Sequence, residues 1–305
     1  MIPLGGALAL AVVDFLAPGA NCRAPRLDVT LSGAAARQGA IVVVTVGSDV
    51  ALSRASASFE GHGSELESGG DGRFRGLVGV DFESATGPAA LALEVEGLCG
   101  DRHTVRRTID VRSGRFAVEK LTVAPEYVEP PADELDRIRE DREKVARVWK
   151  SGDAGRRWSG PFRLPVDAPV REKSFGSRRV FNGTPRSPHA GLDLAAPAGA
   201  PIDAPAPGRV ALAEDLYFSG GTVILDHGAG LFTSYFHLSR IDVKAGDVLA
   251  AGDRLGAAGA TGRATGPHLH WSARLDDARI NPLFLLKLPV WPLPAAKPSL
   301  TGQSN

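Results

Sequence analysis

Two pairs of side chains in the C-terminal half of the chain stand at spacings that suit metal binding. His189 and Asp193 are four residues apart in a stretch rich in glycine and proline, which favours extended chain and turns over helix. His268 and His270 are two residues apart and directly follow another Gly- and Pro-containing loop. Because side chains alternate along a β-strand, the two members of each pair would share one face.

Imidazole and carboxylate groups are ordinary zinc ligands. His189, Asp193 and one histidine of the second pair make three ligands of mixed nitrogen and oxygen type, which leaves the fourth position to water. The remaining histidine would be free to transfer protons near neutral pH. The spacing alone does not decide which histidine takes which role. The sequence therefore predicts an open zinc centre with a proton-transfer group beside it.

Short apolar runs between glycine-containing turns must position these residues. From Phe162 onward they predict an antiparallel, largely all-β domain, with runs at residues 208–212, 221–227, 231–238 and 248–256. Strict alternation in the third run would place His237 on one face together with Thr233 and Tyr235. That face is opposite Phe236, so we expect His237 to look into a groove. His227 is interpreted as a turn residue, not as a ligand.

The N-terminal part of the chain has a different pattern. Short alternating runs between residues 26 and 118 are separated by turn-prone stretches such as residues 67–72, a spacing typical of an immunoglobulin-like β-sandwich. Residues 133–149 then carry apolar side chains at helical spacing, with acidic groups first and basic groups last. We expect a solvated helix with one apolar stripe packed on a domain. An alternative is a regulatory element that shields the catalytic groove.

Composition restricts the class of protein. The 305 residues carry 35 basic and 35 acidic side chains, so no nucleic-acid partner is indicated. The first 22 residues resemble the apolar part of a secretory signal, although Asp14 interrupts the run and no transmembrane helix is evident. We expect an exported protein of the periplasm or cell envelope, with membrane association through the N-terminus as an option. Cys22 and Cys99 would form one disulfide or stay unpaired.

Separated motifs of the C-terminal half together resemble a known family. The motifs are Phe175-Gly-Ser-Arg178, Asn182-Gly183, His189-x-x-x-Asp193, Asp226-His-Gly228, Thr233-x-Tyr235-x-His237-Leu238, Thr261-Gly-Arg263, Gly266-Pro-His268-Leu-His270 and Asn281-Pro282. In this order, over roughly residues 160–285, they resemble the M23 zinc metallopeptidases, the lysostaphin/LytM-type peptidoglycan endopeptidases. The one mild departure is Ala200, where the family usually has threonine.

The resemblance implies a role for each matching residue at the centre. His189, Asp193 and His270 would bind one zinc ion. His237 and His268 would work beside the metal, one taking the water proton and the other stabilising the oxyanion and feeding the leaving amine. Which of the two does which is left open.

Four further residues are candidate substrate contacts, namely Tyr235, Thr233, Asn182 and Arg178. A packing role is an equal alternative for Tyr235 and Thr233, and a bracing role is an alternative for Asn182 and Arg178.

The expected organisation is all-β with a short helical linker. It comprises an atypical signal or anchor segment at 1–22, an immunoglobulin-like β-sandwich at 23–120, a helical linker at 121–160, an antiparallel LytM-type M23 peptidase domain at 161–290 and a Pro-rich tail at 291–305.

The expected activity is zinc-dependent hydrolysis of peptide cross-links or stem peptides of bacterial peptidoglycan, with a metal-activated water attacking the scissile carbonyl. The alternative is a non-catalytic LytM-like factor that binds the wall or activates an amidase. Such members typically lack a metal ligand, whereas all are present here. A regulatory or activating protein is a further expected partner. The sequence does not decide which peptidoglycan bond is cut.

Overall fold

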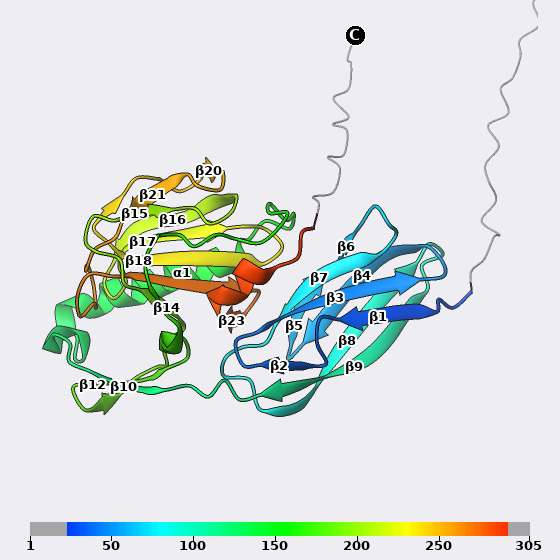
Figure 1. The fold of residues 1–305 in the computed structure, drawn as a ribbon, viewed down its shortest axis with the longest axis horizontal. Helices are drawn as coiled ribbons and strands as arrows, with labels where there is room; N and C mark the ends of the chain where they lie inside the picture. Colours follow the sequence, from blue (N-terminus) through cyan, green and yellow to red (C-terminus); the bar gives the residue numbers. More distant parts are fainter. Residues whose placement is uncertain (1–22, 292–305) are drawn as a thin grey trace, which may run out of the picture.

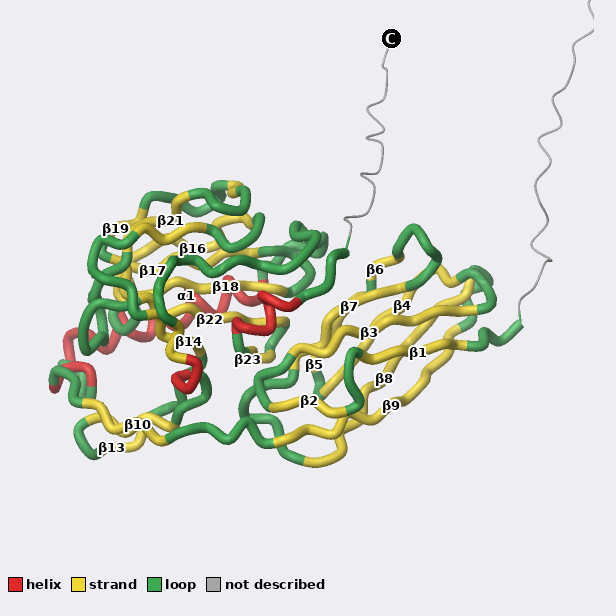
Figure 2. Tube along the Cα trace, viewed as in Figure 1, coloured by secondary structure: helices red, strands yellow, loops and turns green. Residues whose placement is uncertain are grey.

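A computed structural model describes residues 23–291, which form two β-rich parts lying side by side (Figure 1). The tube in Figure 2 shows that strands dominate both parts and that helix is confined to one long segment and several short turns. The largely all-β fold expected from the sequence is confirmed. Within residues 23–291 no helix is long and apolar enough to cross a membrane.

The N-terminal part consists of two sheets around one core. The first sheet has the order β1 (Leu27–Leu31), β3 (Ile41–Ser48), β7 (Phe74–Gly79) and β6 (Glu67–Ser68). The second has the order β2 (Ala35–Arg37), β9 (Arg102–Arg112), β8 (Gly87–Gly97), β4 (Leu52–Phe59) and β5 (His62–Glu65). Alternating apolar side chains of both sheets, including Val44, Leu91 and Ile109, are fully buried in one cluster. This is the arrangement of a sandwich; its immunoglobulin type stays a prediction.

The C-terminal part is built on one antiparallel sheet. Its order is β11 (Val170–Arg171), β14 (Gly191–Leu194), β22 (Leu269–Leu275), β18 (Leu231–Leu238), β17 (Gly220–Asp226), β16 (Gly208–Leu216) and β20 (Val248–Leu249), and β23 (Ala278–Ile280) pairs with β22. A smaller sheet joins β15 (Pro201–Asp203), β21 (Arg254–Ala257) and β19 (Arg240–Ile241). Short 3-10 turns are η3 (Glu172–Ser174) and η4 (Pro282–Lys287).

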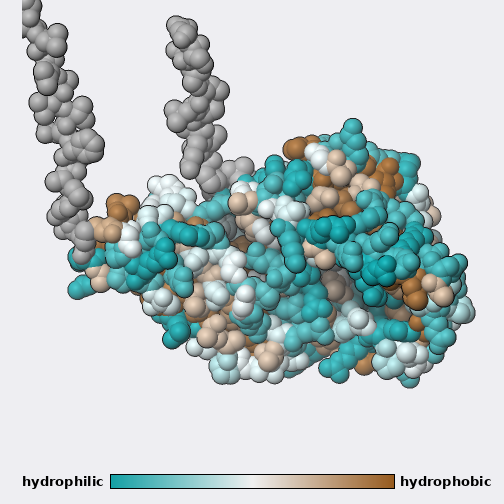
Figure 3. Space-filling model, turned by 180° about the vertical axis from the view of Figure 1, so that it is seen from behind, coloured by the Kyte–Doolittle hydropathy of each residue, from teal (hydrophilic) through white to brown (hydrophobic). Residues whose placement is uncertain are grey.

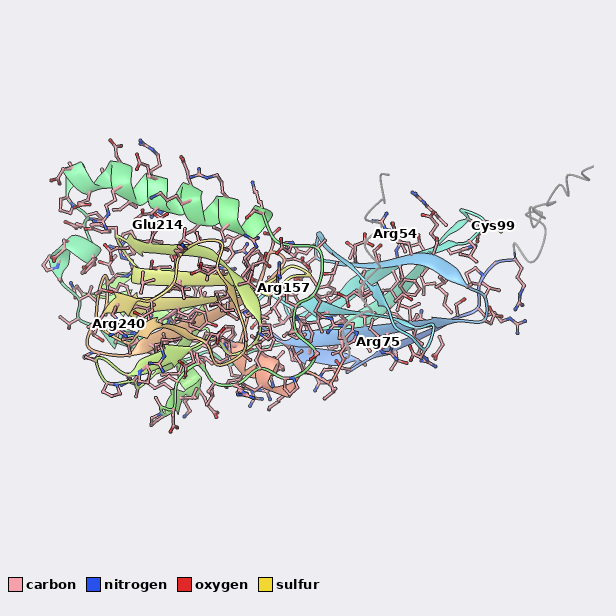
Figure 4. The ribbon with its side chains drawn as sticks, turned by 90° about the horizontal axis from the view of Figure 1, so that it is seen from above. Arg54, Arg75, Cys99, Arg157, Glu214 and Arg240 are labelled. Atoms are coloured by element: carbon pink, nitrogen blue, oxygen red, sulfur yellow. The ribbon has the colours of Figure 1, made fainter. Side chains whose placement is uncertain are left out.

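The predicted helix is α1 (Leu135–Lys150), and it packs along one face of the large sheet (Figure 4). Its apolar stripe, which includes Val148, joins a small core with Ile224 and Phe232. Asp136 lies in its first turn and Arg147 in its last, as the helix dipole favours. The predicted packing is confirmed.

The segment between the two parts is structured for most of its length. β10 (Val118–Leu121) pairs in parallel with β12 (Arg178–Phe181), which also pairs with β13 (Thr184–Pro185). Two 3-10 turns, η1 (Pro125–Tyr127) and η2 (Ala132–Glu134), lead from β10 to α1. The linker is thereby fixed to the C-terminal part.

The two parts share an apolar contact. Phe82 of the N-terminal part forms edge-to-face pairs with Phe116 and Phe175, with ring centroids 6.1 and 5.8 Å apart. Arg279 donates to Asp81 at 2.8 and 2.9 Å across the same junction. The side of the molecule turned away in Figure 1 is largely hydrophilic with small apolar patches (Figure 3). The apolar side chains of the two parts are buried mainly in separate clusters.

The predicted signal or anchor segment, Cys22 with its predicted pairing to Cys99, and the Pro-rich tail beyond Trp291 lie outside the described residues.

Candidate metal centre

Two neighbouring strands bring the predicted ligands together. β14 and β22 pair antiparallel, and the register places Asp193 directly opposite His270. His189 lies just before β14, where its backbone N–H donates to the carbonyl of Ser177 at 2.9 Å. Figure 1 shows β14 near the edge of the large sheet, on the side that faces β10 and β12. Residues that are 77 to 81 positions apart in sequence therefore meet.

The three side chains converge on one point. Nε2 of His189 lies 2.6 Å from Nδ1 of His270, and Oδ1 of Asp193 lies 3.1 and 3.2 Å from these two nitrogens. All three residues are buried, with exposed fractions of 4, 8 and 7% for His189, Asp193 and His270. Among the described residues, this is the one group of three or more such side chains whose ligand atoms lie within 4.8 Å of one another.

The protonation of this cluster fits a cation. Nδ1 of His189 donates to the carbonyl of Ser174 at 2.7 Å, so in the neutral ring Nε2 presents its lone pair to His270 and Asp193. Burial lowers the pKa of His270 to about 3, which keeps that imidazole neutral. Desolvation raises the pKa of Asp193, but the close contacts of its carboxyl group with the His189 and His270 rings outweigh desolvation, and the carboxyl pKa is lowered overall. Two neutral imidazoles and one carboxylate are the form in which zinc ligands bind.

Residues outside the ligand set hold it in place. Arg179 donates to Oδ2 of Asp193 at 2.7 Å, and the hydroxyl of Ser174 accepts the Asp193 backbone N–H at 3.0 Å. The ring of Phe236 stacks on His270 with centroids 5.0 Å apart and planes 5° apart. Sequence reasoning missed these three supporting residues. For Arg179, the alternation of side chains along β12 was a signal in the sequence. Arg179 and Phe181 are two residues apart and therefore share one face of the strand, and in the structure both line the groove.

The two remaining predicted histidines stand next to the ligands. His268 lies just before β22 and its Nε2 is 3.7 Å from Oδ1 of Asp193. The ring centroids of His237 and His268 are 4.9 Å apart. Nδ1 of His237 donates to the carbonyl of Thr261, and Nδ1 of His268 donates to the carbonyl of Gly266, each at 2.8 Å. In each neutral ring Nε2 is consequently the atom free to accept a proton.

A β-bulge aims His237 at the centre. The pairing of β17 with β18 shifts register between Gly221 and Val223, and His237 has a φ of 65° in the left-handed region. The alternation expected from the sequence does not hold beyond Tyr235, because Phe236 and His237 both contact His270, the latter with ring centroids 6.1 Å apart. Burial, together with the charge of the neighbouring His268, lowers the pKa of His237 to about 4.

The four candidate substrate residues lie away from the ligand atoms. Thr233 and Tyr235 are fully buried, and their hydroxyls are 2.7 Å apart, so their burial favours the packing alternative. Asn182 braces the linker, because its amide accepts from the N–H of Val123 at 3.1 Å and donates to the Val123 carbonyl at 2.9 Å. Arg178 is exposed on β12 and does not line the groove. Substrate contact by these four stays a prediction.

His227 lies in the turn between β17 and β18, as predicted, and its side chain is buried. It is fully buried, Nδ1 donates to the carbonyl of Pro207 at 2.7 Å, and Nε2 accepts from Thr233 at 2.7 Å. Burial lowers its pKa to about 4. The interpretation that it is not a ligand agrees with these contacts, because both ring nitrogens are occupied.

A groove of about 250 Å³ opens at the centre. Its lining includes Asp193 and His268 from the centre, Arg179 and Arg263 beside them, and Glu119 of β10. α1 contributes no residue to this lining, so the helix does not shield the groove. A larger hollow of about 1260 Å³ lies between β3 and η4, and none of the five predicted zinc and catalytic residues lines it.

Comparisons with known proteins identify the family to which the segment with these residues is similar. The model of peptidase family M23 matches residues 187–282. A crystal structure from Pseudomonas aeruginosa assigned to peptidase M23 superposes with a TM-score of 0.62 and 31% identity, covering 82% of this chain and 93% of that one.

Two curated relatives match the C-terminal part. Peptidoglycan DD-endopeptidase ShyA of Vibrio cholerae is 40% identical over 121 residues, which is 39% of this chain and 28% of the relative. DD-carboxypeptidase/endopeptidase Mpg of Neisseria gonorrhoeae is 40% identical over 95 residues, which is 31% of this chain and 22% of the relative. The matched segment thus spans less than a third of the length of either relative.

Proposed function

The chain belongs to peptidase family M23, and from this premise we propose that its C-terminal part is a zinc-dependent endopeptidase acting on bacterial peptidoglycan. The observation that carries the proposal is the convergence of His189, Asp193 and His270 on one buried point, with two further histidines beside it. A ligand set with an open position and adjacent proton-transfer groups is the equipment of metal-assisted hydrolysis.

His189, Asp193 and His270 would hold the metal. Zinc held there would supply Lewis-acid chemistry, lowering the pKa of a bound water and polarising a peptide carbonyl. The part of the chain that the structure describes places no free glutamate beside the ligands to serve as base, since Glu119 on the groove wall lies near Arg179. Proton transfer would therefore fall to the two remaining histidines.

His237 and His268 are arranged for that task. Each Nδ1–H donates to a backbone carbonyl, which fixes the orientation of the ring. Nε2 is then the nitrogen that can exchange a proton with the substrate or water. Neutral His237, with a pKa well below 7, is in the form that accepts a proton. One histidine would take the water proton, and the other, once protonated, would stabilise the oxyanion and donate to the leaving amine.

The proposed substrate class rests on the names of the relatives and on the access of solvent to the groove. ShyA is named for peptidoglycan DD-endopeptidase activity and Mpg for DD-carboxypeptidase and endopeptidase activity, which supports wall peptides as the substrate class. Solvent reaches the groove at the exposed lining residues Thr265 and Pro267, and access of this kind is needed for a cross-linked polymer. We propose that the protein acts outside the cytoplasm, where this polymer lies.

Digestion of purified sacculi tests the proposal. Zinc-loaded protein should release soluble stem peptides that mass spectrometry identifies, and their masses would name the bond. His270→Ala should release none, because it removes one of three ligands. A protein that holds zinc and releases no fragment would favour a non-catalytic role such as amidase activation.

A further inference from the structure

Arg263 is held beside the metal centre by two aromatic rings. Its guanidinium carbon lies 4.9 Å from the ring centroid of Phe181 and 4.8 Å from that of Phe218. Its backbone N–H donates to the carbonyl of Phe218 at 2.8 Å, which fixes the loop that carries it. Arg263 lines the same groove as Asp193 and His268. The cation is therefore positioned on the groove wall and is not a freely moving surface group.

This cation has no anionic partner within residues 23–291. No carboxylate of the described chain forms an ion pair with Arg263, whereas its groove neighbour Arg179 pairs with both Asp193 and Glu119. Burial and the nearby charges of Arg179 and Arg186 lower the pKa of Arg263 to about 10, so the side chain is still cationic at neutral pH. A half-buried guanidinium without a counter-charge is unfavourable, and an incoming anion would relieve that cost.

The other arginines of the groove do not offer the same site. Arg179 already binds Asp193 at 2.7 Å and lies 3.4 Å from Glu119. Arg186, which lies near but outside the lining, donates to the carbonyl of Val128 at 2.6 Å. Arg171 lines the groove but is exposed and is not clamped by aromatic rings. Arg263 is thus the positioned and unpaired cation.

We propose that Arg263 binds a free carboxylate of the substrate peptide next to the bond that is cut. This inference rests on the proposed function and narrows its substrate class. A planar guanidinium matches a carboxylate in a two-point contact. Cross-links in which D-alanine is joined to meso-diaminopimelate carry such a carboxylate on the carbon beside the scissile nitrogen, whereas glycine bridges carry none. The site would accordingly prefer the former.

A matched pair of peptides tests the preference. Both contain the D-alanine to meso-diaminopimelate link, and they differ only in whether the carboxyl beside the scissile nitrogen is free or amidated. We expect the full-length zinc-loaded protein to cleave the free acid with a kcat/KM roughly ten- to hundredfold higher, the range for a hydrogen bond to a charged group. Most of that difference should lie in KM, because the contact forms in the ground state as well.

Substitutions of Arg263 distinguish an effect of its charge on the substrate from an effect on the fold. Arg263→Gln should bring the ratio of kcat/KM for the free acid over the amide close to one, and Arg263→Lys should retain part of that ratio. Arg240→Gln is the control, since Arg240 is an exposed arginine paired with Asp242 and lies at the end of the C-terminal part far from the sandwich (Figure 4). It should retain the full preference.

Binding of both peptides is measured alongside cleavage by calorimetry. Selective binding of the free acid that Arg263→Gln abolishes supports the inference even if neither peptide is cut, and that result would overturn only the proposed function. Equal cleavage and equal binding of acid and amide would overturn the inference and leave the function standing. An equal loss on both peptides in Arg263→Gln would likewise show that Arg263 acts on the fold and not on a carboxylate.

Discussion

Replacing Gly191 by alanine should remove the zinc site while leaving the fold intact. A Cβ added at Gly191 would lie 2.5 Å from Nε2 of His270, 2.7 Å from its Cε1 and 2.8 Å from the backbone oxygen of Trp271. Ordinary contacts of this kind begin at 3.4 Å. The His270 ring must move to make room, and the close approach to the Trp271 oxygen of β22, which is paired on both sides, must also open between β14 and β22.

The required movement is large on the scale of a metal site. Bringing 2.5 Å to 3.4 Å needs a shift of about 0.9 Å in the His270 ring, whereas metal–ligand distances tolerate about 0.2 Å. Disturbing even a supporting residue of a metal site costs roughly 10- to 100-fold in affinity or activity. We expect Gly191→Ala to weaken zinc binding at least 100-fold and to cost about 1–3 kcal/mol of folding stability by overpacking.

Competition for zinc with a chromogenic chelator measures this loss at neutral pH. Gly155→Ala is the matched control, because no atom lies within 4 Å of a Cβ added there and its φ is not positive. The control should bind zinc as the unaltered protein does. If Gly191→Ala kept full zinc affinity in a folded protein, His270 would not be a ligand held in the position described here.

Three further outcomes are expected. Arg179→Met removes the donor to Oδ2 of Asp193 and should lower zinc affinity or peptide hydrolysis roughly 10- to 100-fold with little change in melting temperature; unchanged values would assign Arg179 a purely peripheral role. Burial lowers the pKa of His227 from its ordinary value of 6.5 to about 4 in the fold, so the unfolded chain binds more protons between these pH values. Stability should be fully present above pH 6.5 and fall by about 3 kcal/mol as the pH drops to 4, and urea unfolding of His227→Gln should show a shallower pH slope. Asn182→Gly keeps the positive φ of 50° but removes both side-chain bonds to Val123, so hydrogen exchange should report faster opening of the linker there, by about 1 kcal/mol or more; unchanged exchange would mean that β10 alone holds the linker.

The ligands of the centre could be predicted from the sequence because they occur in closely spaced pairs along the chain. His189 and Asp193 stand close together, and His270 follows His268 by two residues, so pairing rules for strands predict shared faces. The register that sets Asp193 opposite His270 is a long-range property of strand pairing, and no local pattern specifies it.

Other features depend on contacts that no local pattern encodes. The bulge that turns His237 toward the ligands breaks the period-two alternation on which its placement was predicted. Arg179 was missed because its role depends on the pairing that brings β12 alongside Asp193. The contact of Phe82 with Phe175 joins the two parts through residues that are isolated in the sequence.

The proposed domain boundaries, the N-terminal signal or anchor, export and a regulatory or activating partner stay predictions.

Zinc titration of metal-free protein, with peptide release from sacculi as the readout, tests the assignment of a zinc peptidase most directly. Release should be absent without metal, rise in proportion to added zinc and reach its maximum at one zinc per chain, while Asp193→Ala should stay inactive throughout. Release by the metal-free protein, or full release by Asp193→Ala, would contradict the proposal that His189, Asp193 and His270 form the catalytic metal centre.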